Sequence, residues 1–132
     1  MQGSNVRGLI SCTCDAWQAS NVDGYFAVTG HWVEKNDGGI LTLQNSLLGF
    51  VCLNGGHSGK RLGQTLFKVF DRVGAVHKIG WVTCDNASNN STMMEELAHR
   101  IEKRTGQKFC PVERRIRYLH FILMSWCSAT YY

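Results

Sequence analysis

Two aspartates have the sequence surroundings that a catalytic metal site requires. Asp15 and Asp85 each follow the same two residues, in the sequence Thr-Cys-Asp, and each closes a short apolar run. If each ends a strand, both carboxylates are held rigidly and can meet at one edge of a sheet. Carboxylates are the hard oxygen ligands that Mg²⁺ prefers, and two Mg²⁺ ions can clamp the attacking and leaving oxygens of a displacement at phosphorus. The pair therefore predicts a metal site for phosphoryl transfer, which a third acid usually completes.

The segments that must position these acids alternate between strand and helix patterns. Runs of β-branched and aromatic residues predict strands at 9–15, 25–34, 40–48, 79–84 and 116–124. Apolar residues at steps of three and four predict helices between Ser58 and Gly74 and over 89–105. This order predicts an α/β fold with a mixed five-stranded sheet, in which an antiparallel three-strand meander is followed by strand, helix, strand, helix and strand, with the helices packed on the sheet. The first and fourth strands are then parallel neighbours.

Length and composition favour one domain over residues 1–132. The chain is 44% hydrophobic with one proline, which is enough for one core and too little for two. Six cysteines without a secretory leader indicate reduced thiols in a nuclear or cytoplasmic protein rather than a secreted one. No apolar run reaches the roughly 20 residues that span a bilayer. The net charge of +4 permits a nucleic-acid partner without requiring one.

Five segments resemble, in order, the catalytic core of hAT-superfamily transposases. They are residues 13–20 (TCDAWQAS), 25–32 (YFAVTGHW), 53–59 (LNGGHSG), 82–90 (VTCDNASNN) and 114–117 (RRIR), within a resemblance that covers residues 8–117. The resemblance implies an RNase H-like fold and metal-dependent cleavage and transfer of DNA strands, with Mg²⁺ or Mn²⁺ as cofactor. Asp15 matches the first catalytic aspartate of the family, which bridges both ions, and Asp85 matches the second, which binds one. It also implies DNA as the partner and the nucleus as the place of action.

The sequence departs from the family at the third metal ligand. In hAT transposases the third metal ligand is a glutamate that follows a large helical insertion after the fifth strand, whereas this chain ends at Tyr132. We therefore expect a domain that is incomplete at its carboxyl end, with weakened metal binding and little or no activity by itself. A second departure follows Arg117, where the family has Cys-x-x-His and this chain has Tyr118-Leu119-His120, so that His120 stands one position early.

Other functional readings stay open beside the transposase core fragment. A non-catalytic RNase H-like module that binds nucleic acid or protein would keep the fold without the chemistry, and a small nuclease would need His120 as third ligand. Asp85 could serve only as a turn former or helix cap. The basic residues Arg114, Arg115 and Arg117, with His120, form either a phosphate-binding patch or a solvated surface. Without further helices one sheet face would stay uncovered and apolar, which predicts self-association.

Overall fold

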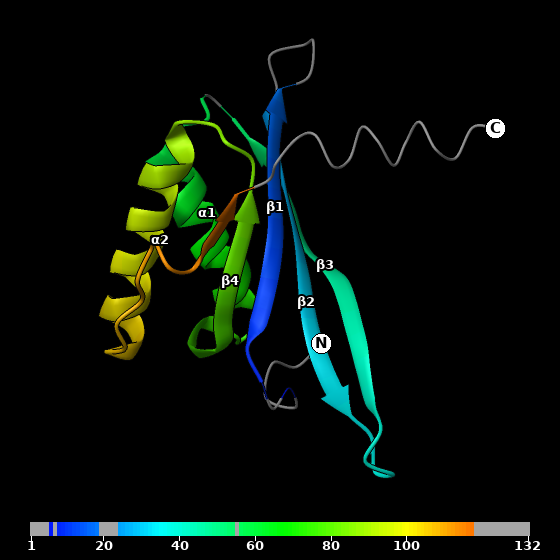
Figure 1. Ribbon diagram of the computed structural model, residues 1–132. Helices are drawn as coiled ribbons and strands as arrows, with labels where there is room; N and C mark the ends of the chain where they lie inside the picture. Colours follow the sequence, from blue (N-terminus) through cyan, green and yellow to red (C-terminus); the bar gives the residue numbers. More distant parts are fainter. Residues whose placement is uncertain (1–5, 7, 19–23, 55, 118–132) are drawn as a thin grey trace, which may run out of the picture.

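A mixed five-stranded sheet forms the centre of the computed structural model, which describes residues 6, 8–18, 24–54 and 56–117. The strands are β1 (Ile10–Gln18), β2 (Gly24–Lys35), β3 (Leu41–Leu53), β4 (Ile79–Cys84) and β5 (Arg115–Arg117). The helices are α1 (Gly59–Arg72) and α2 (Asn89–Thr105), with a short 3₁₀ helix η1 (Val76–Lys78) before β4. The strands lie in the order β3-β2-β1-β4-β5 (Figure 1). The fold is therefore α/β with an RNase H-like arrangement, as the sequence predicted.

The strand directions also match the prediction. β1 pairs with β2, and β2 with β3, in antiparallel register, whereas β4 is parallel to both β1 and β5. The turn between β2 and β3 forms because the Asn36 side chain accepts a hydrogen bond from the Ile40 amide at 2.9 Å and Gly39 adopts a φ of 82°. The tip of this long β2–β3 hairpin extends beyond the helices (Figure 1).

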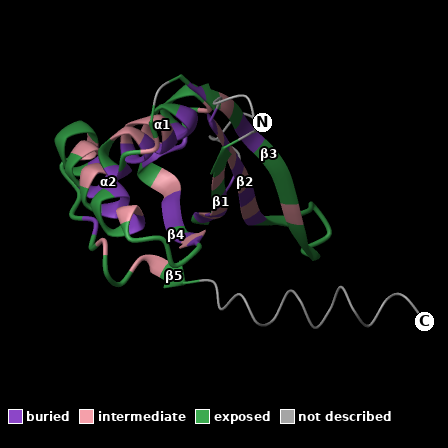
Figure 2. Cartoon of the chain, turned by 90° about the horizontal axis from the view of Figure 1, so that it is seen from above, coloured by how far each residue is buried: buried purple, intermediate pink, exposed green. Residues whose placement is uncertain are grey.

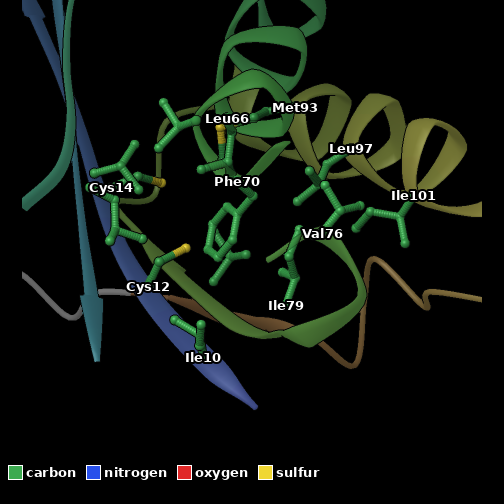
Figure 3. Close-up of a cluster of buried hydrophobic side chains, with 14 of the residues drawn as sticks. Ile10, Cys12, Cys14, Leu66, Phe70, Val76, Ile79, Met93, Leu97 and Ile101 are labelled. Carbon is green, nitrogen blue, oxygen red and sulfur yellow. The ribbon is translucent and has the colours of Figure 1, made fainter. Parts of the chain in front are cut away.

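Both helices pack on the same face of the sheet (Figures 1 and 2). The α1 helix begins where the Ser58 hydroxyl accepts a hydrogen bond from the Arg61 amide at 3.3 Å, and α2 ends at Gly106 with a φ of 71°. Buried side chains of β1 meet buried side chains of both helices and of β4 in one core (Figure 3). The residues of this core that Figure 3 labels are Ile10, Cys12, Cys14, Leu66, Phe70, Val76, Ile79, Met93, Leu97 and Ile101.

The largest differences from the predicted strand boundaries are at β1, β3 and β5. β1 runs three residues beyond Asp15 because its pairing with β2 continues to Gln18 opposite Gly24, so the prediction that Asp15 ends its strand is wrong. β3 continues to Leu53 for the same reason, pairing with β2 to its end. β5 covers Arg115–Arg117, and residues 118–124 of the predicted fifth strand lie outside the described residues.

The sheet face opposite the helices carries an exposed aromatic cluster. Trp17, Tyr25 and Phe50 come from three adjacent strands, with ring centroids between 5.6 and 6.1 Å apart. Nearer the hairpin tip, Leu41 and Leu43 of β3 are 66% and 73% exposed. Self-association through this apolar face stays a prediction. In the part of the chain that the structure describes, no helix is long and apolar enough to cross a membrane.

Candidate metal site

Asp15 of β1 and Asp85, the residue directly after β4, lie at corresponding positions of two adjacent parallel strands. The register pairs Thr13 with Thr83, and each aspartate follows two residues later in its own segment. Both residues line one small cleft of about 120 Å³, together with His57, Asn89 and Asn90. The structure thus brings together the two acids that the sequence singled out.

Asp15 is held by the strand itself. Its backbone lies opposite Ala27 of β2, and its side chain is exposed while the neighbouring Cys14 is buried in the core. Successive side chains of a strand point to opposite faces, so Asp15 shares the open sheet face with Trp17 of the aromatic cluster. The sheet fixes this carboxylate in place and leaves it open to solvent.

Asp85 is held by a turn that leads from β4 into α2. Its Oδ1 atom accepts hydrogen bonds from the Ala87 amide at 3.0 Å and from the Asn90 side-chain amide at 2.5 Å. The same Asn90 amide donates to the Asp85 carbonyl oxygen at 3.0 Å. Asn90 is buried, with 6% of its surface exposed, and the sequence analysis did not single it out. Asp85 is therefore a turn former before a helix as well as a candidate ligand.

Of the two half-buried arginines proposed to bind phosphate, Arg115 contacts the Asp85 turn and Arg114 does not. Arg115 donates one hydrogen bond to the Asp85 carbonyl oxygen at 3.2 Å and another to the Ser91 hydroxyl at 3.0 Å. The guanidinium of Arg114 lies over the Trp81 ring, 4.9 Å from its centroid. Arg115 thus fastens the Asp85 turn to the start of α2, a role that spacing alone could not reveal. Arg117 is exposed at the end of β5, and His120 lies outside the described residues.

Three buried cysteines, Cys12, Cys14 and Cys84, lie on β1 and β4, the strands that position the acids. Together with the exposed Cys52 and Cys110, they are free thiols. A hydrogen bond from the Cys14 thiol lowers the pKa of Cys84 to about 7 against the opposing effect of burial, and nearby Arg115 lowers it further. The same hydrogen bond raises the pKa of Cys14, with burial adding to the rise. Burial raises the pKa of Cys12 to about 12. Cys127 lies outside the described residues.

The donor set of the cleft fits a divalent cation in part. Two carboxylates at one cleft supply the hard oxygen atoms that Mg²⁺ and Mn²⁺ prefer. Among residues 6, 8–18, 24–54 and 56–117, no group of three or more His, Cys, Asp or Glu side chains is placed to hold a metal ion. The described residues therefore offer a pair of ligands rather than a cage.

Comparison with known proteins identifies the family of this fold. The family described as the ZBED1 RNase-like domain matches residues 13–109, which is most of the chain and includes both aspartates. The chain belongs to this family. It is a hAT-type, transposase-derived domain, which confirms the resemblance seen in the sequence.

The related proteins are much longer than this chain. A putative AC transposase of Zea mays is 26% identical over 106 residues, which are 80% of this chain and 13% of the transposase. A putative transcriptional regulator, tpeD, of Talaromyces stipitatus is 32% identical over 102 residues, which are 77% of this chain and 12% of the regulator. The domain thus spans about an eighth of the length of these relatives, one named for transposition and one for regulation.

Proposed function

We propose that this domain is the metal-binding part of a hAT-type DNA-strand cleavage site, with Asp15 and Asp85 as ligands of Mg²⁺ or Mn²⁺. The observation that supports this most directly is that Asp15 of β1 and Asp85, directly after the adjacent parallel strand β4, line one cleft. The bound ion would supply Lewis-acid activation of a phosphodiester. The relatedness to a putative transposase supports DNA as the substrate, and hence the nucleus as the place of action.

Different parts of the protein position the two acids of this proposed site. Asp15 is positioned by the sheet, and Asp85 by its turn, by Asn90 and by Arg115. Since two hydrogen bonds converge on Oδ1 of Asp85, we expect its Oδ2 atom to be the one that binds the cation. Because no third ligand joins the pair among the described residues, we propose that full catalysis needs a further carboxylate from elsewhere and that this chain alone binds the ion without efficient cleavage.

A second function is favoured by the similarity to a protein named as a putative transcriptional regulator. In this reading the domain is a non-catalytic module that binds nucleic acid or protein, and the acids keep only their structural roles. The hydrogen bonds of Asp85 to Ala87 and Asn90 show that it has such a role. The two functions differ in whether the two acids bind a metal ion that a DNA phosphate shares.

Coupling between metal and DNA distinguishes these functions. Mn²⁺ affinity would be measured by calorimetry for the wild-type chain, Asp15→Asn and Asp85→Asn, with and without a short DNA duplex. A cleavage site shares its cation with a phosphate, so DNA should tighten Mn²⁺ binding several-fold in the wild-type chain and leave both variants unchanged. Equal Mn²⁺ affinity with and without DNA would contradict the cleavage-site proposal and favour the module.

Plasmid nicking provides the catalytic measurement. We expect wild-type nicking in Mn²⁺ to stay near the level of Asp15→Asn and Asp85→Asn, because both ions of a two-metal site must be held in fixed geometry. Strong nicking that both variants abolish would show that the pair suffices, contrary to the proposed need for another carboxylate.

A further inference from the structure

β3 leaves one edge of the sheet open over its first half. It is the outermost strand, and among the described residues its backbone pairs with β2 alone. Leu48 is the extra residue of a β-bulge, and its carbonyl oxygen accepts a hydrogen bond from the Arg72 side chain of α1 at 2.8 Å. The open edge is therefore residues 41–47, on the hairpin that extends beyond the helices (Figure 1).

The turn at the tip of the hairpin determines which backbone groups face this open edge. The Asn36 amide donates to the Ile40 carbonyl oxygen at 3.0 Å, which makes these residues a hydrogen-bonded pair. Hydrogen-bonded and non-hydrogen-bonded pairs alternate along antiparallel strands, so the next pair, Lys35 with Leu41, is non-hydrogen-bonded. Every second residue from there to the bulge directs its amide and carbonyl away from β2. These residues are Leu41, Leu43, Asn45 and Leu47.

Residues 41–47 lack the features that protect edge strands from pairing. Their sequence, LTLQNSL, contains no charged residue and no proline, and the bulge lies beyond their end. Natural edge strands usually carry a lysine, a proline or a bulge for this protection. Leu41, Leu43 and Leu47 are 66%, 73% and 60% exposed. The segment therefore suits pairing with another strand better than contact with water.

We propose that residues 41–47 pair antiparallel with the same residues of a second copy of this chain, about a two-fold axis at Gln44. This register places Leu41 opposite Leu47 of the second copy, and Leu43 opposite Asn45. Both pairs join residues whose amides and carbonyls face outward, so they become hydrogen-bonded pairs. An axis at any other residue would leave part of the open edge unpaired.

The side chains of the segment also match themselves in this register. Thr42, Gln44 and Ser46 share one side of the strand, and the Gln44 side-chain amide donates to the Thr42 hydroxyl at 3.3 Å. Pairing places Thr42 opposite Ser46 of the second copy and Gln44 opposite itself, so polar residues meet polar ones. The leucines gather on the other side, and no like charges are opposed. A second copy thus supplies the pattern that the segment requires.

The resulting dimer has one continuous sheet through both copies. The two-fold axis is perpendicular to the sheet, so the side that carries Asp15 faces the same way in both copies. Pairing through the edge needs no metal ion, and it therefore stands independently of the proposed cleavage site. It also differs from stacking of two sheets through the aromatic cluster of Trp17, Tyr25 and Phe50.

Sedimentation equilibrium with charges placed at the axis tests this register. Gln44→Lys and Gln44→Glu each put like charges directly opposite one another, so each should raise the dimer dissociation constant by about fivefold or more. An equimolar mixture puts opposite charges together and should return the constant to within about twofold of the wild-type value. The control, Thr42→Lys, adds the same charge to the same side of β3 but faces Ser46, so it should weaken the dimer far less. Circular dichroism melting verifies that each variant folds.

Three outcomes would overturn the proposal. A wild-type chain that stays monomeric at its highest soluble concentration would show that the edge does not pair with itself. Equal weakening by Thr42→Lys and Gln44→Lys, without recovery in the mixture, would exclude an axis at Gln44. Phe50→Ser should leave the dimer unchanged, whereas a dimer that Phe50→Ser abolishes and Gln44→Lys does not would assign the contact to the aromatic cluster.

Discussion

Asn90 donates hydrogen bonds to both the side chain and the backbone carbonyl of Asp85, and so fixes the acid to the first turn of α2. Asn90→Ala would remove both bonds while leaving the carboxylate in place. We expect a loss of about 1–3 kcal/mol in the free energy of unfolding, because buried polar partners lose their bonds. Urea denaturation measures this.

The same variant tests whether Asn90 positions a metal ligand. Mn²⁺ affinity should fall by roughly tenfold, as for other groups that orient a ligand. Asn45→Ala, at an exposed position of β3, should change neither stability nor Mn²⁺ affinity appreciably. Unchanged Mn²⁺ affinity in a folded Asn90→Ala chain would show that Asn90 is purely structural.

Gly63 allows α1 and α2 to approach closely. A Cβ atom there would lie 2.6 Å from the Met93 carbonyl oxygen and 2.8 Å from the Glu96 Cβ atom. Because the carbonyl belongs to a helix backbone, Gly63→Ala should destabilise the fold by about 1–3 kcal/mol through overpacking, although alanine favours helix by about 1 kcal/mol. Thermal melting compares it with Lys68→Ala on the exposed side of the same helix, for which little change is expected. A stabilised Gly63→Ala would show that the helices can separate without cost.

The buried thiol of Cys12 should make the fold sensitive to alkali. Its pKa is raised by burial from 9.0 to about 12, so between these values the folded chain keeps a proton that the unfolded chain loses. Stability that is fully present below pH 9 should therefore fall as pH rises, by up to about 1.4 kcal/mol per pH unit. Cys12→Ala should start less stable and lose less over the range from pH 8 to pH 10. Cys110→Ala, at an exposed position, should follow the wild-type slope. A parallel pH dependence for Cys12→Ala and the wild-type chain would contradict this cause.

The sequence predicted the elements and their order because its local signals were strong. Alternating apolar residues marked β2, helical spacing marked α1, and Asn36 with its glycines marked the turn. The end of β1 was missed because pairing with β2 decides where that strand stops, and no local residue records this pairing. The meeting of Asp15 and Asp85 followed correctly from the order of the strands.

The side-chain contacts that support the candidate site could not be predicted from the sequence, because they join residues that are far apart along the chain. Nothing local to Arg115 indicates that its guanidinium reaches back to the Asp85 carbonyl, 30 residues away along the chain. The repeated asparagines after Asp85 were the one signal that could have revealed Asn90.

Binding of Mn²⁺, followed by electron paramagnetic resonance in the absence of DNA, tests the central claim most directly. In the proposed site the two carboxylates bind the ion, so Asp15→Asn and Asp85→Asn should each weaken binding by about tenfold or more. Asparagine keeps the hydrogen-bonding oxygen, and the turn at residue 85 should survive. Asp37→Asn, in the β2–β3 turn, should bind as the wild-type chain does. Wild-type affinity in both Asp15→Asn and Asp85→Asn would contradict the account.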